Sequence, residues 1–163
     1  HWVEFARSLI DSGEIEAAEE TVEKALGQHP SEARLWFLRA ALHKERGRAD
    51  RSLADLERAV ELSPRYKEAL FALGVERLEQ GYVEEALPPL GDVVALDPQH
   101  LEGWRHYAIA HTRARNWEEA LDSWRKVRGL DPEDPQAAQN IPRISQFLGA
   151  PASPGTPAHK GGR

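Results

Sequence analysis

Small, apolar and turn-forming residues recur along this chain with a period of 34 residues, which is the pattern of an internal repeat. The proline column consists of Pro30, Pro64, Pro98 and Pro132. A glycine column holds Gly13, Gly47 and Gly81 with Arg115 in the fourth place, and a bulky column holds Trp2, Trp36, Leu70 and Trp104. Three further columns of small or β-branched residues share this phase, so chance does not explain the match and about four equivalent units are predicted.

The residue pattern within each unit predicts two helices joined by a short turn. In residues 33–66, one helical face carries Trp36 and Ala40, and a second helical pattern follows Gly47, whose unconstrained backbone suits a tight turn. Pro64 ends the second pattern, because the residue before a proline is pushed out of the α region. The unit is therefore a helical hairpin with helices of about 14 residues and short connections.

These positions resemble the tetratricopeptide repeat, whose pattern runs bulky, small, glycine, small, large, small, proline. In the second unit the matching residues are Trp36, Ala40, Gly47, Ser52, Leu56, Ala59 and Pro64, and in the fourth they are Trp104, Ala108, Arg115, Ala120, Trp124, Val127 and Pro132. The resemblance covers residues 1–132 and implies an all-α fold, an α-solenoid of about four hairpins with a C-terminal capping helix. The approximate units are 1–32, 33–66, 67–100 and 101–134.

Two departures from the pattern affect the expected backbone. Arg115 replaces the turn glycine, and we expect Asn116 to take the left-handed or capping role there. Pro88 and Pro89 fall early in the second helix of the third unit, where a proline beyond the first turn costs about 3 kcal/mol. We therefore expect that helix to start late or to bend.

The two ends of the array differ from its middle. Trp2 already occupies the bulky column, so the first unit begins in mid-helix, and we expect another repeat or domain in front of it. After the fourth unit, residues 135–149 predict a capping helix with an apolar stripe and a kink at Pro142. Residues 150–163 are rich in Pro, Gly and Ser and predict a disordered tail.

Composition narrows the possible partners. Lys and Arg number 21 against 27 Asp and Glu, giving a net charge of −6 with the charges interspersed, which disfavours nucleic acid and anionic membranes as partners. The chain has no Cys, which excludes thiolate chemistry within it, and no apolar run approaches the roughly 20 residues of a membrane span. The Ala- and Arg-rich, Met-free composition suggests a bacterial source, and a cytoplasmic location is favoured.

The resemblance implies that the first helix of each hairpin lines a concave groove, where a second apolar stripe is the feature to seek. The third unit offers such a stripe in Phe71, Val75 and Leu78, and the other units add Phe37 and Ile109. Basic residues at matching places are Arg7, Arg34, Arg105 and Arg113. This predicts a groove for an amphipathic or extended peptide with acidic residues, unless the apolar residues pack between units and the arginines are simply solvated.

The leading hypothesis is thus a scaffold that binds a protein or peptide, without a cofactor or a metal and without enzymatic activity. An alternative is a structural or self-association module of a larger protein, and a third is the regulatory segment of an enzyme. Some family members grip a C-terminal carboxylate with a Lys, Asn and Arg clamp, but the matching places here do not carry those residues. No helical His and Glu zinc pattern, phosphate loop or catalytic triad order is visible, and His43 and His111 are expected in the core.

Overall fold

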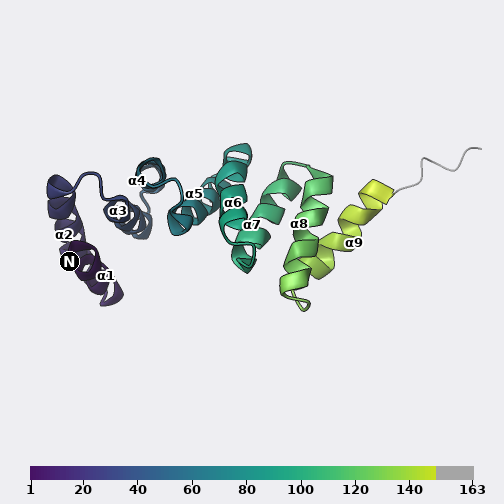
Figure 1. Cartoon of the computed structure of the whole chain (residues 1–163), viewed down its shortest axis with the longest axis horizontal. Coiled ribbons are helices and arrows are strands. Elements are labelled where there is room, and N and C mark those ends of the chain that lie inside the picture. The colour runs from purple at the N-terminus through teal and green to yellow at the C-terminus, as the bar shows by residue number, and fades with distance from the viewer. Residues whose placement is uncertain (150–163) are drawn as a thin grey trace, which may run out of the picture.

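The computed structural model describes residues 1–149, which form four consecutive helical hairpins and a last helix (Figure 1). The first helices of the hairpins are α1 (Trp2–Asp11), α3 (Ala33–Glu45), α5 (Lys67–Glu79) and α7 (Leu101–Arg113). The second helices are α2 (Ile15–Gln28), α4 (Ala49–Leu62), α6 (Val83–Leu96) and α8 (Trp117–Leu130), and α9 spans Pro135–Gly149. The expected all-α solenoid is confirmed. Residues 150–163, for which we expected a disordered tail, lie outside the described residues.

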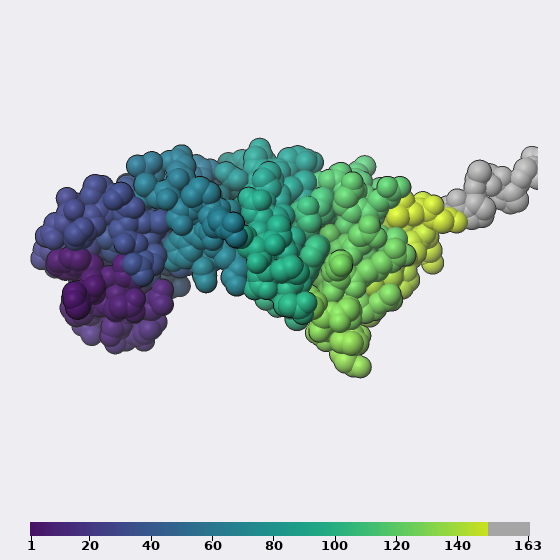
Figure 2. Space-filling model, viewed as in Figure 1, coloured from purple at the N-terminus to yellow at the C-terminus, as the bar shows by residue number. Residues whose placement is uncertain are grey.

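The hairpins stack side by side, so that each one contacts only its neighbours along the chain. The result is an elongated arch whose underside is hollowed near the middle (Figure 2). Such a one-dimensional arrangement buries a continuous core only by stacking, as a repeat array must. No helix within residues 1–149 combines the length and the apolar character needed to cross a lipid bilayer.

All four hairpins turn through the same backbone motif. Gly13, Gly47 and Gly81 have φ values of 77°, 68° and 86°, the left-handed conformation that glycine adopts without strain. At the third turn, the Gly81 N–H donates to the Leu78 carbonyl at 3.2 Å, and the next N–H donates to the Arg77 carbonyl at 2.8 Å. This pair of bonds satisfies the last carbonyls of the first helix and explains the glycine column.

The fourth turn corrects one expectation. Arg115 itself adopts the left-handed conformation, with φ at 61°, and makes the same pair of bonds through the Thr112 and His111 carbonyls at 3.3 and 2.9 Å. Asn116 is not left-handed; it stands at the N-cap position of α8 without a side-chain capping bond, and its side-chain amide lies 3.3 Å from the His111 Nδ1 atom. The hydrogen-bond pattern fixes which position in the turn is left-handed, whatever residue stands there.

The bulky and proline columns meet at the junctions between hairpins. The Trp36 indole N–H donates to the Pro30 carbonyl at 2.8 Å, and the Trp104 indole N–H donates to the Pro98 carbonyl at 2.9 Å. Each bond ties the start of a first helix to the turn that precedes it. The same bond between the bulky and proline columns thus recurs at the first and third junctions, and Leu70 has no side-chain N–H to make it at the second.

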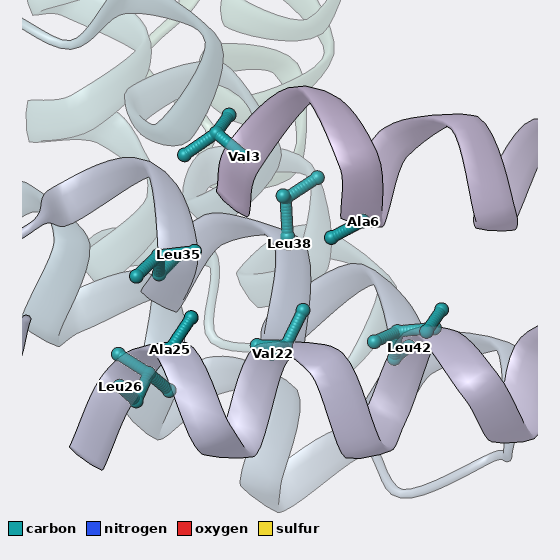
Figure 3. Close-up of a cluster of buried hydrophobic side chains, with 9 residues drawn as sticks. Val3, Ala6, Val22, Ala25, Leu26, Leu35, Leu38 and Leu42 are labelled. Atoms are coloured by element: carbon teal, nitrogen blue, oxygen red, sulfur yellow. The ribbon is translucent and has the colours of Figure 1, made fainter. Parts of the chain in front are cut away.

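Small residues allow the close helix packing of the core. Figure 3 shows the first cluster, in which Val3 and Ala6 of α1 face Leu38 of α3 above Val22 of α2. At the third hairpin the approach is closer still, because a Cβ atom added to Gly74 would lie 2.5 Å from the Leu90 Cγ atom. Glycine at that place therefore lets α5 and α6 cross without displacing the Leu90 side chain.

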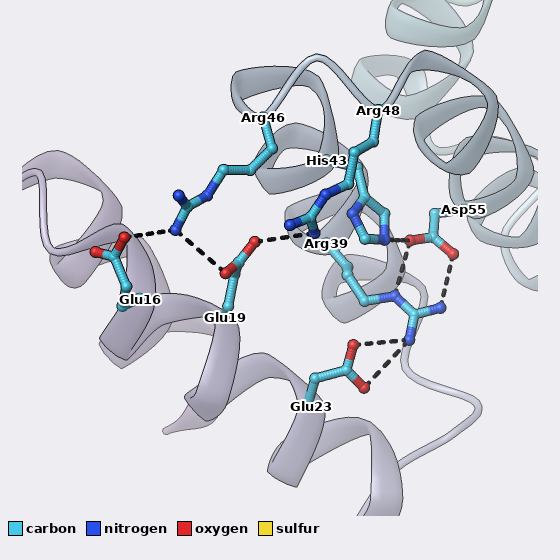
Figure 4. A network of polar contacts seen from close by, with 8 residues as sticks. All are labelled: Glu16, Glu19, Glu23, Arg39, His43, Arg46, Arg48 and Asp55. Carbon is cyan, nitrogen blue, oxygen red and sulfur yellow. Dashed lines mark hydrogen bonds and ion pairs between the residues drawn. The ribbon is translucent and has the colours of Figure 1, made fainter.

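Buried charge also links the first two hairpins. The Arg39 guanidinium donates two hydrogen bonds to Asp55, at 2.8 and 2.7 Å, and another to Glu23 at 3.2 Å (Figure 4). Asp55 is only 5% exposed, so this bidentate pair lies in a partly dry environment where it is stronger than a surface pair. Because the three residues come from α2, α3 and α4, the network fixes their relative positions.

The prolines of α6 do not delay its start. The helix begins at Val83, in step with the other second helices, and continues through Pro88 and Pro89. Pro89 has no N–H to offer the Glu85 carbonyl, and the Arg77 guanidinium donates to that oxygen at 2.8 Å instead. An arginine from α5 thus supplies the donor that the proline removes. The helix α9 likewise continues through Pro142.

Candidate functional site

The candidate site is an apolar hollow of about 210 Å³ between the first helices α3 and α5. Its walls are Phe37, Ala41, Phe71, Ala72 and Val75, and the α4 residues Ser52 and Leu56 lie at its base. Contact between α3 and α5 is weaker than that between α1 and α3 or between α5 and α7, so the hollow opens where two first helices separate. We call this hollow the α3–α5 groove.

The two phenylalanines of the groove are held by aromatic neighbours from the next hairpin. Phe37 packs against Tyr66 with ring centroids 5.2 Å apart, and Phe71 packs against His100 at 5.1 Å. The His106 ring lies nearly perpendicular to the Phe71 ring, with the ring centroids 5.2 Å apart. Burial raises the pKa of Tyr66, so its hydroxyl stays protonated at neutral pH. Both phenylalanines remain half-buried, so one part of each ring is packed and another part faces the groove.

One end of the groove is polar. The Lys44 ammonium lies 2.9 Å from a carboxylate oxygen of Glu76 and 2.6 Å from one of Glu79. Burial lowers the pKa of Lys44, but the hydrogen bonds to the two carboxylates outweigh it and the net shift is upward. Glu76 is 3% exposed and also accepts a hydrogen bond from Gln80 at 3.2 Å. Glu76 was not among the residues predicted from the sequence, because its partner Lys44 comes from another helix.

Three of the four arginines expected on the groove rim are engaged within the protein. Arg34 pairs with Glu32 at 2.9 Å, and Arg113 donates to the Leu78 carbonyl at 3.0 Å. Arg105 pairs with Glu102 and also donates to the buried carboxylate of Asp134, at 2.6 Å from its terminal nitrogen. Arg7 is exposed on α1 and has no ion pair among residues 1–149.

The pairing of Arg105 repeats a relation seen twice in the groove. Phe37 with Tyr66, Phe71 with His100 and Arg105 with Asp134 each join residues 29 positions apart, at the same two places of successive repeats. Asp134 also accepts a hydrogen bond from the Ala137 N–H at 2.7 Å, which makes it the N-cap of α9. The pair of positions that is aromatic at two junctions is therefore an ion pair at the last one. Arg105 binds the carboxylate that caps α9.

The remaining apolar residues lie at different depths. Val75 is half-buried in the groove wall, as noted, whereas Leu78 is 4% exposed and packs with Ala86 and Leu90 in the core. Leu78 is therefore a core residue, which corrects its place on the predicted stripe. Ile109 is half-buried and packs against the core clusters on both sides of α7.

The two histidines expected in the core lie at different depths, with His111 buried and His43 half-buried. His111 is 7% exposed, and burial lowers its pKa while Glu119 and Glu84 oppose the shift, so its imidazole is neutral at pH 7. Burial also lowers the pKa of His43, whose Nε2 atom lies 3.5 Å from Asp55. Within residues 1–149, no three His, Asp or Glu side chains are grouped so as to hold a metal ion.

Comparison with known proteins agrees with this architecture. The family model of the tetratricopeptide repeat matches residues 3–67, 42–100 and 71–135. Among solved structures, the chain is similar to YrrB, described as a TPR protein with an unusual peptide-binding site, with a TM-score of 0.85 and 20% identity over 93% of this chain and 78% of that one.

The chain is also similar to the protein MamA. One structure of MamA gives a TM-score of 0.78 and 17% identity over 88% of this chain and 84% of that one. The segment of MamA from residue 41 to its end, from Desulfovibrio magneticus, gives a TM-score of 0.79 and 18% identity over 91% and 84%. At these identities the likeness concerns the fold alone. No curated protein sequence matches the chain.

Proposed function

The chain belongs to the tetratricopeptide repeat family, and on that basis we propose that it is a protein-interaction scaffold that binds a peptide or a partner helix in the α3–α5 groove. The observation that carries this proposal is the apolar hollow of about 210 Å³ with Phe37, Phe71 and Val75 in its walls. An apolar concave site with a few polar groups at one end is the usual form of a binding site. No enzymatic activity is part of the proposal.

The groove is prepared for an apolar anchor. Because Phe37 and Phe71 already pack against Tyr66 and His100, a ligand does not have to order them, which reduces the entropic cost of binding. A single leucine or phenylalanine side chain inserted between them would gain about 1.5–3 kcal/mol from burial. YrrB, which shares this fold, is described as having a peptide-binding site, and this supports a ligand of the same class here.

The basic residues at the groove rim favour acidic ligand residues only weakly compared with the preference for an apolar side chain. Since Arg34, Arg105 and Arg113 are engaged within the protein, the preference for acidic residues that we predicted rests on Arg7. An exposed ion pair with a ligand carboxylate contributes about 0–1 kcal/mol, less than the apolar anchor. The groove therefore selects first for an apolar side chain and only second for charge.

The test is affinity capture from the source cell with quantitative comparison of variants. Ala41→Glu places a charged side chain in the groove without removing any packed atom, and Phe71→Glu removes one groove wall. Ala95→Glu is the matched control, because Ala95 is an exposed alanine of the second helix α6, outside the groove. We expect partners to be lost with Ala41→Glu and Phe71→Glu and retained with Ala95→Glu. Equal recovery with all three variants would contradict groove binding.

A second candidate function, self-association, is favoured by the ends of the described array. Phe5 of α1 is 55% exposed at one end, and Phe147 and Leu148 of α9 are 61% and 43% exposed at the other. Head-to-tail contact of such ends is a heterologous interface and would give chains of molecules. Light scattering across a wide concentration range tests it, with Phe147→Ser as the variant that should dissociate the assembly. A monomer at every concentration would rule this candidate out.

A further inference from the structure

A second and larger hollow lies along the second helices α4 and α6. Two adjoining depressions, of about 350 Å³ and about 340 Å³, share Glu57 and Arg77 in their walls. None of the residues that line them lies in the α3–α5 groove. We call the two depressions together the α4–α6 trough.

The floor of the trough is apolar. Val60, Leu73 and Pro89 line one depression, and Leu53 lines the other. Tyr82, which is 49% exposed, stands at its edge. Because Val60 and Leu53 are only half-buried, apolar surface remains for a partner to cover.

Arg77 divides the trough and is fully engaged. Its guanidinium donates to the Glu85 carbonyl at 2.8 Å, the oxygen left without a donor by Pro89, and to the Glu57 carboxylate at 2.9 Å. Arg77, which belongs to α5, therefore connects α4 and α6. Its guanidinium compensates the charge of Glu57 and forms no ion pair with the other carboxylates of the trough.

Carboxylates dominate the walls. The acidic lining residues are Asp50, Glu57, Glu61, Glu85 and Asp92, and Arg77 is the one basic lining residue. Glu57 pairs with Arg77, and Glu61 pairs with Arg58 at 2.9 Å. Asp50, Glu85 and Asp92 are exposed and have no ion pair within residues 1–149. Three uncompensated negative charges thus surround a partly exposed apolar floor.

From this combination we infer that the α4–α6 trough is a second docking surface, whose partner is a protein segment with apolar side chains flanked by lysine or arginine. The apolar side chains cover the floor, and the cationic groups meet the three carboxylates. Complementary charge of this kind steers association and fixes the orientation of the partner. The inference does not depend on the α3–α5 groove, which uses different residues on the first helices.

The test uses three synthetic helical peptides of equal length as fluorescent probes, composed of Leu and Lys, of Leu and Glu, and of Ser and Lys. Binding is measured by fluorescence anisotropy at low and at physiological salt. The trough variant carries Asp50→Asn, Glu85→Gln and Asp92→Asn. The control variant carries Glu4→Gln, Asp11→Asn and Glu118→Gln, which removes the same charge from exposed places elsewhere, two of them likewise in the first turn of a helix.

We expect the peptide of Leu and Lys to bind the wild-type protein, to bind the trough variant about tenfold more weakly and to bind the control variant unchanged. The other two peptides should bind much more weakly, because each lacks one of the two features. Equal weakening in both variants would assign the effect to overall charge and overturn the inference. Failure of the peptide to bind the wild-type protein would also overturn the inference. Loss of binding with Ala41→Glu would do the same, because it would place the peptide in the α3–α5 groove. Circular dichroism checks that each variant is folded.

Discussion

Replacement of Arg115 by glycine should stabilise the protein. Arg115 is the non-glycine residue with positive φ in the described chain, at 61°, in a turn where the other three hairpins have glycine. A left-handed conformation costs an L-residue about 1–2 kcal/mol, and this cost disappears with glycine. The greater freedom of glycine in the unfolded chain offsets about 0.4–1 kcal/mol of this, so the mid-range values leave a net gain of about 0.8 kcal/mol.

The structure isolates the backbone as the cause of this gain. Arg115 is exposed and makes no ion pair within residues 1–149, so its side chain contributes little that the variant would lose. The reciprocal change, Gly81→Ala, introduces a Cβ that meets no atom within 4 Å, so its cost of about 1 kcal/mol also comes from the backbone alone. Arg115→Ala is the control for the side chain, and its stability should stay near that of the wild type.

The measurement is equilibrium unfolding in urea, followed by circular dichroism and by tryptophan fluorescence. Arg115→Gly should raise the midpoint and leave the slope unchanged, and Gly81→Ala should lower the midpoint by a similar amount. The two sites are 34 positions apart and share no partner, so the double variant should return to within about 0.5 kcal/mol of the wild type. Stabilisation by Arg115→Ala equal to that by Arg115→Gly would refute the reasoning, because the side chain would then be the cause.

Three further predictions concern single sites. Burial holds the pKa of His111 below its ordinary value of 6.5, so the unfolded chain binds the proton first and the free energy of unfolding should fall as the pH drops below about 6.5. Urea unfolding between pH 8 and 5 measures this. His111→Gln should reduce the pH dependence without abolishing it, because burial lowers the pKa of His43 as well. Gly74→Ala should destabilise the protein by about 1–3 kcal/mol despite the better helix propensity of alanine, because the new Cβ meets Leu90; a neutral thermal midpoint would show that Leu90 adapts. Asp134→Ala removes the cap of α9 and the ion pair between Arg105 and Asp134, so amide hydrogen exchange in α9 should accelerate at least tenfold, while exchange in α1 should not change.

The repeat architecture could be predicted because its determinants are local and periodic. The columns that contain Gly81, Trp36 and Pro30 each correspond to an observed turn or junction, and each recurs at a fixed spacing that one sequence displays. The place of Phe37 and Phe71 on the first helices follows from the same register. The pattern could not predict how deeply each residue is buried, since Leu78 continues the stripe of Phe71 along α5 but is covered by α6 of its own hairpin and by α7.

Two of the bonds that engage the predicted rim arginines reach partners far apart in the sequence. Arg105 binds Asp134 29 positions away and Arg113 binds the Leu78 carbonyl 35 positions away, and no local pattern points to either partner. Local spacing does not predict the bond of Arg77 to the Glu85 carbonyl either, because that carbonyl lacks a helical donor only through Pro89. A side chain with several possible acceptors cannot be assigned from helical spacing alone.

The relation between residues 29 positions apart determines how freely the hairpins of this chain could be rearranged. A phenylalanine in one first helix is matched to Tyr66 or His100 at the start of the next, whereas Arg105 is matched to Asp134. A duplication of the third hairpin would therefore preserve an aromatic pair at the new junction. A second copy of the second hairpin would instead set Phe37 against Glu32, and the fourth hairpin moved inward would separate Arg105 from Asp134. The order of the units is encoded at their boundaries, and any recombination of them would have to exchange the boundary residues in pairs.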